Sequence, residues 1–74
     1  MKQNLHRIIE NRTTLYGLKK QLISYMDDKD SFIHNEAIEQ LNLVNTAITT
    51  CWESIKRVEE TFGEEFKEEN IIPL

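Results

Sequence analysis

The sequence predicts an all-α protein, an antiparallel hairpin of two helices with a coiled-coil-like seam, which assembles into a homo-oligomeric helical bundle. Only two glycines and one proline occur in 74 residues, so the residues that usually separate β-strands are scarce. Apolar residues instead recur at helical spacing in two long segments. A single domain of this length buries little core, and the single cysteine, Cys51, excludes an internal disulfide. Self-association is therefore expected.

The first helix is expected over about residues 3–27. Apolar residues one, three and seven positions apart recur in this segment, so they lie along one stripe of a helix. They do not alternate with polar residues as in a strand. They are Leu5, Ile8, Ile9, Leu15, Tyr16, Leu22, Ile23 and Met26.

A polar turn is expected over residues 27–31, followed by a second helix over about residues 32–62. Asp30 or Ser31 is expected to cap the start of this helix by accepting from its free N–H groups. Steps of four and three separate its apolar residues, the 3.5-residue repeat of a coiled-coil seam. They are Ala37, Leu41, Val44, Ile48, Cys51, Ile55, Val58 and Phe62. The short connection predicts antiparallel helices.

Gly63 is expected to end the second helix in the left-handed conformation and to leave residues 63–74 as an acidic and apolar tail that ends in Ile71-Ile72-Pro73-Leu74. Several large apolar residues flank the two stripes and are expected to contact other protomers. They are Leu18, Tyr25, Phe32, Ile38, Leu43 and Trp52.

Charge divides at the turn, because residues 1–26 carry a net charge of +4 and residues 27–74 carry −8. Arg12 and Lys19 share a seven-residue series with Leu5 and Met26, so two cations occupy positions of the packed stripe. One interpretation is that their stems pass the edge of the seam or pair with acidic residues of the second helix. The other is an anion site, in which Arg12 and Lys19 hold phosphates on either side of a base stacked on Tyr16.

The second helix carries threonines at 46, 49 and 50, close to Trp52 and to the basic pair Lys56-Arg57. Threonines in a helix commonly donate to the carbonyls of the preceding turn and need have no further role. Alternatively, Thr46, Thr49 and Thr50 line a polar pocket between protomers. The Lys56-Arg57 pair fits either a solvated face opposite Glu53 and Glu60 or a ring around an axial anion site in a symmetric bundle. Trp52 fits either an oligomer contact or a platform for base stacking.

Several classes of function are excluded by what the sequence lacks. No phosphate-binding glycine loop, no paired carboxylates on an apolar background and no Ser-His-Asp order are found, so no catalytic residues are expected and the protein is not expected to be an enzyme. The lone cysteine and the distant histidines His6 and His34 predict neither a metal site nor a cofactor. No segment is apolar enough for a membrane span or a signal peptide, so a cytoplasmic protein complete from Met1 is expected. The negative net charge disfavours binding to duplex nucleic acid.

The pattern Thr46-x-Ile48-x-Thr50-Cys51-Trp52-x-x-Ile55-x-Arg57 resembles the last helix of a family of small phage proteins that counter cyclic-oligonucleotide-based antiphage signalling. The resemblance implies a helical hairpin that forms hexamers and binds cyclic di- and trinucleotides between subunits without cleaving them. On this match, Arg57 falls on the basic position of the trinucleotide pocket, and Thr46 on the threonine that opens the motif. The family's extra N-terminal segment, with its base-stacking tyrosine, has no counterpart here.

The sequence thus leaves two classes of function open. The first is a non-enzymatic binding protein that sequesters a cyclic oligonucleotide in the host cytoplasm, with Arg57, Thr46 and Thr50 as the main site and Arg12, Tyr16 and Lys19 as a second one. The alternative is a helical module that inhibits a host protein such as a nuclease or polymerase, or a purely structural bundle.

Overall fold

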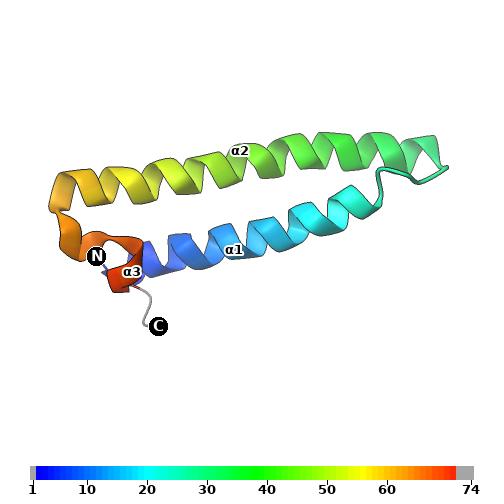
Figure 1. Cartoon of the computed structure of the whole chain (residues 1–74). Coiled ribbons are helices and arrows are strands. Elements are labelled where there is room, and N and C mark those ends of the chain that lie inside the picture. Colours follow the sequence, from blue (N-terminus) through cyan, green and yellow to red (C-terminus); the bar gives the residue numbers. More distant parts are fainter. Residues whose placement is uncertain (1, 72–74) are drawn as a thin grey trace.

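The computed structural model describes residues 2–71, which form two long antiparallel helices and a short C-terminal segment (Figure 1). Helix α1 spans Lys2–Ser24 and helix α2 spans Ser31–Phe62. A 3-10 turn, η1, follows at Glu64–Phe66, and a single helical turn, α3, at Glu68–Ile71. The molecule is elongated, 48 × 23 × 14 Å, because its longest dimension is the length of α2. The predicted all-helical hairpin is confirmed.

Helix α1 ends about three residues earlier than expected. The backbone tightens there, because the N–H groups of Tyr25 and Met26 donate to Leu22 and Ile23, three residues back. The carbonyl of Met26 then accepts from Nδ1 of His34 in α2, at 2.6 Å. This bond gives the Met26 carbonyl, just after α1, a donor from α2, so this carbonyl needs no donor from a further helical turn.

Helix α2 begins where the cap was predicted. The Asp30 carboxylate accepts from the backbone N–H groups of Phe32 and Ile33, at 2.9 and 3.4 Å. Asp28 stabilises the preceding turn by accepting from the N–H of Asp30 at 2.8 Å. The aspartates of the turn thus supply acceptors for backbone donors that have no helical partner.

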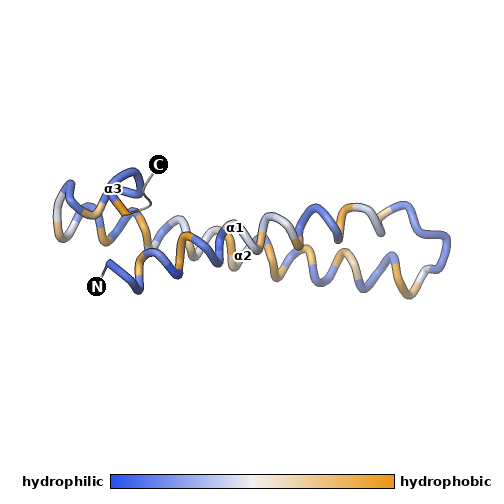
Figure 2. The backbone as a smooth tube through the Cα atoms, turned by 90° about the horizontal axis from the view of Figure 1, so that it is seen from below, coloured by the Kyte–Doolittle hydropathy of each residue, from blue (hydrophilic) through white to orange (hydrophobic). Residues whose placement is uncertain are grey.

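The predicted seam of α2 is buried or partly buried as far as Val58. Ala37, Val44, Ile48 and Ile55 are buried, Leu41, Cys51 and Val58 are partly buried, and Phe62 is exposed. Figure 1 shows the reason, because α2 runs past the first turn of α1 and leaves its own last turn without a partner helix. Apolar residues recur along both helices, whereas the turn is hydrophilic (Figure 2).

The tail expected after Gly63 is packed on the hairpin over residues 64–71. Gly63 does end α2, with a positive φ of 106°, but its ψ of 179° lies outside the left-handed helical region. The chain then turns back toward the beginning of α1 (Figure 1). Phe66 and Ile71 pack there against a core cluster of Leu5, Ile9 and Ile55. Ile72, Pro73 and Leu74 lie outside the described residues.

The apolar residues expected to flank the seam are exposed. They are Leu18, Tyr25, Phe32, Ile38, Leu43 and Trp52, and Phe32 is the most open at 74%. Whether they contact other protomers stays a prediction. Within residues 2–71, no helix combines the length and apolar character that a membrane span requires.

Candidate functional site

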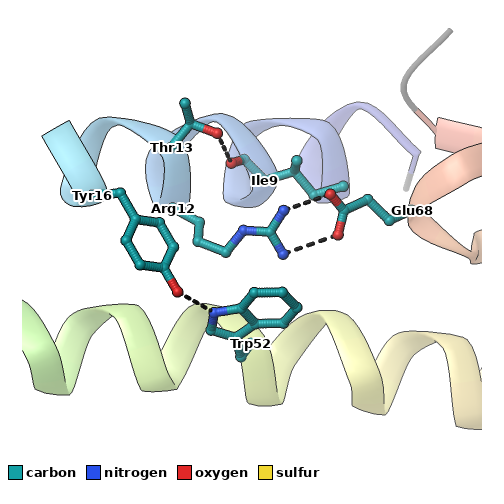
Figure 3. Close-up of polar contacts among 6 residues, drawn as sticks. All are labelled: Ile9, Arg12, Thr13, Tyr16, Trp52 and Glu68. Atoms are coloured by element: carbon teal, nitrogen blue, oxygen red, sulfur yellow. Dashed lines mark hydrogen bonds and ion pairs between the residues drawn. The ribbon is translucent and has the colours of Figure 1, made fainter. Parts of the chain in front are cut away.

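Arg12 is the one charged residue that is buried within the described part of the chain, with 8% of its surface exposed. Its guanidinium donates to both carboxylate oxygens of Glu68, with N–O distances of 2.9 and 2.5 Å (Figure 3). Two parallel N–H···O bonds of this kind fix the orientation of both groups. The pair joins residues 56 positions apart and links α3 to α1.

An aromatic pair from α1 and α2 completes the surroundings of Arg12. The guanidinium carbon lies 4.1 Å from the centre of the Trp52 ring, which is a cation–π contact. The indole Nε1–H donates to the hydroxyl of Tyr16 at 3.0 Å, so the ring is held in place from α1 (Figure 3).

The ion pair shifts the pKa values of both partners. The hydrogen bonds from Arg12 lower the pKa of Glu68, and partial burial of the carboxylate opposes this effect. The bonds to Glu68 raise the pKa of Arg12 in turn, although its burial opposes the rise. Both shifts favour the charged forms, so the pair is ionised across the physiological range.

The geometry changes the interpretation of Arg12. The expected acidic partner on the second helix is replaced by Glu68 of α3, which was expected to lie in the tail after Gly63. Tyr16 supplies its hydroxyl to Trp52, and its ring does not separate two free cations as a base-stacking site requires. Lys19 is half-buried and forms no ion pair with any residue between 2 and 71. Within one chain, Arg12 and Tyr16 of the second candidate site therefore have internal partners, whereas Lys19 has no ion-pair partner among the described residues.

Arg57 and Thr50 lie together on the outer side of α2, away from the seam. They line one groove of about 360 Å³, whose other lining residues are Glu53, Ser54, Lys56 and Glu60. Thr50 also borders a neighbouring groove of about 380 Å³, with Asn45, Thr46, Thr49 and Glu53. The main candidate residues Thr46, Thr50 and Arg57 thus share one helix face.

The threonine hydroxyls make the local bonds that helical threonines commonly make. Thr46 and Thr50 donate to the carbonyls of Asn42 and Thr46, at 3.1 and 3.0 Å, and Thr49 donates to Asn45 at 3.0 Å. This confirms the local interpretation of these residues. Each hydroxyl oxygen keeps lone pairs that can accept from a ligand.

The charges along the outer face are only partly compensated. Lys56 lies 3.9 Å from Glu60 and forms a loose pair one turn apart. Arg57 is exposed and has no ion-pair partner among residues 2–71. Arg57 is therefore a guanidinium available to an external anion.

Sequence reasoning missed Glu68, the partner that decides the role of Arg12. Glu68 was expected to lie in the acidic and apolar tail after Gly63, with no role assigned to it. A signal was available in the flanking residues, because Phe66 and Ile71 place apolar groups on either side of Glu68. This pattern is typical of a short segment that packs one face on a core.

The ion pair predicts a specific loss of stability in acid. Because the folded-state pKa of Glu68 is lowered, its contribution is complete above the unfolded pKa of about 4.3 and is lost as the pH falls through the folded value. We expect Glu68→Gln to reduce the fall in unfolding free energy as the pH drops below about 4.3, by at most about 1 kcal/mol because the Glu68 side chain is 39% exposed. Chemical denaturation at several pH values measures this. Glu69→Gln, which removes an exposed neighbouring carboxylate, should leave the pH dependence as in the wild type.

No protein-family model matches the chain, and no match is found among curated proteins or among solved structures.

Proposed function

We propose that the protein is a non-enzymatic binding protein that assembles as a homo-oligomer and sequesters a cyclic di- or trinucleotide between copies. The observation that carries the proposal is Arg57, an exposed arginine without an internal partner in the described chain, in a groove that it shares with Thr50. Cyclic oligonucleotides are phosphodiester anions, and a guanidinium binds phosphate oxygens in a fork. Such signals act in the cytoplasm, the host cytoplasm if a phage encodes the protein.

The polar residues of the groove fit the remaining parts of a nucleotide. Thr46 and Thr50 already donate to the backbone, so their oxygens act as acceptors for ribose hydroxyls or base amino groups. Glu53 borders both grooves and accepts from the same kind of donor. The cation and the acceptors thus lie side by side, as a molecule with phosphates and base edges requires.

A second copy is needed because every residue of this groove belongs to α2. One helix face surrounds a ligand on one side only, whereas ligand sites cover most of the ligand surface. Self-association is supported by the exposed apolar residues along the hairpin, among them Leu43 at 60% and Trp52 at 48%. A symmetric oligomer repeats the Arg57 face and supplies several phosphates with cations from one short chain.

The proposal predicts that Arg57→Ala weakens binding of the nucleotide by at least tenfold, because a charge-assisted bond to phosphate contributes about 1.5–3 kcal/mol. Light scattering first establishes the oligomer mass of both proteins. Titration calorimetry against cyclic di- and trinucleotides then gives the dissociation constants, and chromatography of the recovered ligand tests that it is intact.

Arg7→Ala is the matched control, because it removes the same group from an exposed position of α1, outside the groove. It should bind as the wild type does. Unchanged affinity of a correctly assembled Arg57→Ala protein would rule out this pocket. Absence of binding by the wild-type oligomer to any cyclic nucleotide would rule out the proposed function.

An apolar groove near the turn of the hairpin favours a second function, the inhibition of a host protein. Leu22, Tyr25, Phe32, Ile33 and Ala37 line an almost entirely apolar groove of about 290 Å³ there, beside Glu36 and Gln40. Apolar grooves with a polar rim are typical of helix-binding surfaces. If cyclic nucleotides do not bind, this groove becomes the primary candidate, and a stoichiometric complex with one purified host protein is the result to seek.

A further inference from the structure

Side chains alone attach the C-terminal segment, residues 64–71, to the rest of the molecule. Phe66 and Ile71 pack against the core at the beginning of α1, and Glu68 pairs with Arg12. The backbone bonds of the segment are local, such as Phe66 N–H to Gly63 and Lys67 N–H to Glu64. Within residues 2–71, no backbone hydrogen bond joins the segment to α1. Such a segment can leave without unravelling either long helix.

Gly63 is the single hinge between α2 and this segment. The chain leaves the direction of α2 at Gly63, whose φ of 106° and ψ of 179° form a conformation that residues with a Cβ rarely adopt. Rotation at Gly63 changes the direction of the segment while α2 stays packed on α1. Short, sharply bent hinges of this kind favour exchange of the hinged element between copies.

We propose that in the homo-oligomer residues 64–71 of one copy dock on the hairpin of a second copy, in the place that this copy's own segment otherwise fills. The inference rests on the self-association in the proposed function and is independent of its ligand. The contacts of Phe66, Glu68 and Ile71 are the same within one copy and between two, so exchange replaces each contact by an identical one.

Charge complementarity supports docking between copies. The segment contains four glutamates, whereas residues 1–26 carry a net charge of +4. Lys2 lies over the Phe66 ring at 5.7 Å and Arg12 pairs with Glu68, so the segment contacts two cations of α1. An acidic segment of one chain is therefore attracted to the basic helix of another.

Exchange also affects Phe62, which is exposed when the segment docks within its own copy. Phe62, the last residue of the seam, is 50% exposed, and the centre of its ring lies 5.9 Å from that of the Phe66 ring. Phe62 adjoins Gly63, so the proposed exchange brings a second chain next to this ring, and burial of the ring against that chain would favour the exchanged form.

The decisive experiment reverses each charge of the ion pair on a different chain. Arg12→Glu and Glu68→Arg each place like charges together within one copy. If the two variants are mixed in denaturant and refolded together, exchange brings the intact Arg12 to the intact Glu68 and the introduced glutamate to the introduced arginine. We expect the mixture to melt roughly 10 °C above either variant alone. Native mass spectrometry should find mixed oligomers.

The double variant R12E/E68R, which restores an ion pair in either arrangement, serves as the reference for the melting temperature. A mixture that melts as the superposition of the two single variants overturns the exchange. If the single variants fail to fold even when mixed, a cross-linking measurement on the wild-type chains decides whether the segment is exchanged.

That measurement refolds isotope-labelled and unlabelled wild-type chains together and cross-links Lys2 to the carboxylates of residues 64–71 with a carbodiimide. Exchange predicts hybrid cross-links at the frequency of random mixing, whereas docking within one copy gives cross-links of one isotope only and overturns the proposal. A monomeric mass overturns the exchange and the oligomer together. An oligomer without hybrid cross-links overturns the exchange alone and leaves the Arg57 site to be judged by nucleotide binding.

Discussion

Replacing Leu5 with alanine is expected to lower the free energy of unfolding by about 3 kcal/mol, a large part of the stability of a chain this short. Leu5 is 1% exposed and belongs to the cluster with Ile9 and Ile55, which Phe66 and Ile71 cover. The substitution removes buried methyl groups and leaves a cavity at the point where three helical elements meet. The effect should therefore exceed that of a leucine on the seam edge.

The matched control is Leu18→Ala, which makes the same chemical change at a residue that is 42% exposed on the same helix. It should cost less than about 1 kcal/mol if the side chain has no partner in solution. Urea denaturation measures both, at one protein concentration because self-association adds to the apparent stability. Equal losses for the two variants would contradict the position of the core. A large loss at Leu18 alone would place that residue in an interface between copies.

The hairpin could be predicted because its two determinants are local. The 3.5-residue repeat from Ala37 to Ile55 requires only neighbours one turn apart, and it led to the buried seam. The cap at Asp30 depends on a carboxylate within reach of two N–H groups of the same turn. Elements whose cause lies within a few residues can be inferred from periodicity and capping.

The first helix was harder to place, because its pattern mixes cations with apolar residues. Arg12 does pair with an acidic residue, as one interpretation of the sequence predicted, but the partner is Glu68 and not a residue of the second helix. The partner lies 56 positions away, beyond the glycine where the chain leaves the direction of α2. Phe66 and Ile71 indicate that residues 64–71 pack on a core, but nothing in their local pattern specifies that this core lies at the beginning of α1, since Gly63 ends a helix equally well before a solvated tail.

The candidate ligand site could be predicted only as far as one helix face. Arg57, Thr46 and Thr50 were expected together from the resemblance of their pattern to one helix of a known family. They share one side of α2, because positions four and seven apart lie on one side of a helix. A pocket closed by a second copy depends on the arrangement of copies, which no spacing within one chain determines. This is why the fold of the chain is better determined by its sequence than the function is.

The last prediction concerns Arg12, whose two contributions can be separated by two substitutions. Arg12→Ala removes the ion pair, the cation–π contact with Trp52 and the packing of the buried stem, and we expect a loss of about 3 kcal/mol. Arg12→Met keeps an apolar stem of similar length against Trp52 and lets the half-exposed Glu68 turn to water. Its loss should be nearer 1 kcal/mol.

The difference between these two variants reveals what the buried guanidinium stabilises. If charge pairing dominated, Arg12→Met would be as unstable as Arg12→Ala, because both lack the cation. If burial of the stem dominates, methionine restores most of the stability while the C-terminal segment loses its ion pair with Arg12.

A double-mutant cycle of Arg12→Met with Glu68→Gln then isolates the ion pair, with an expected coupling free energy of about 1 kcal/mol. Hydrogen exchange at Phe66 to Ile71 should rise in Arg12→Met even where global stability barely changes, because the segment has no backbone bond to α1 within the described residues. Unchanged protection of these amides would show that Phe66 and Ile71 alone hold the segment in place.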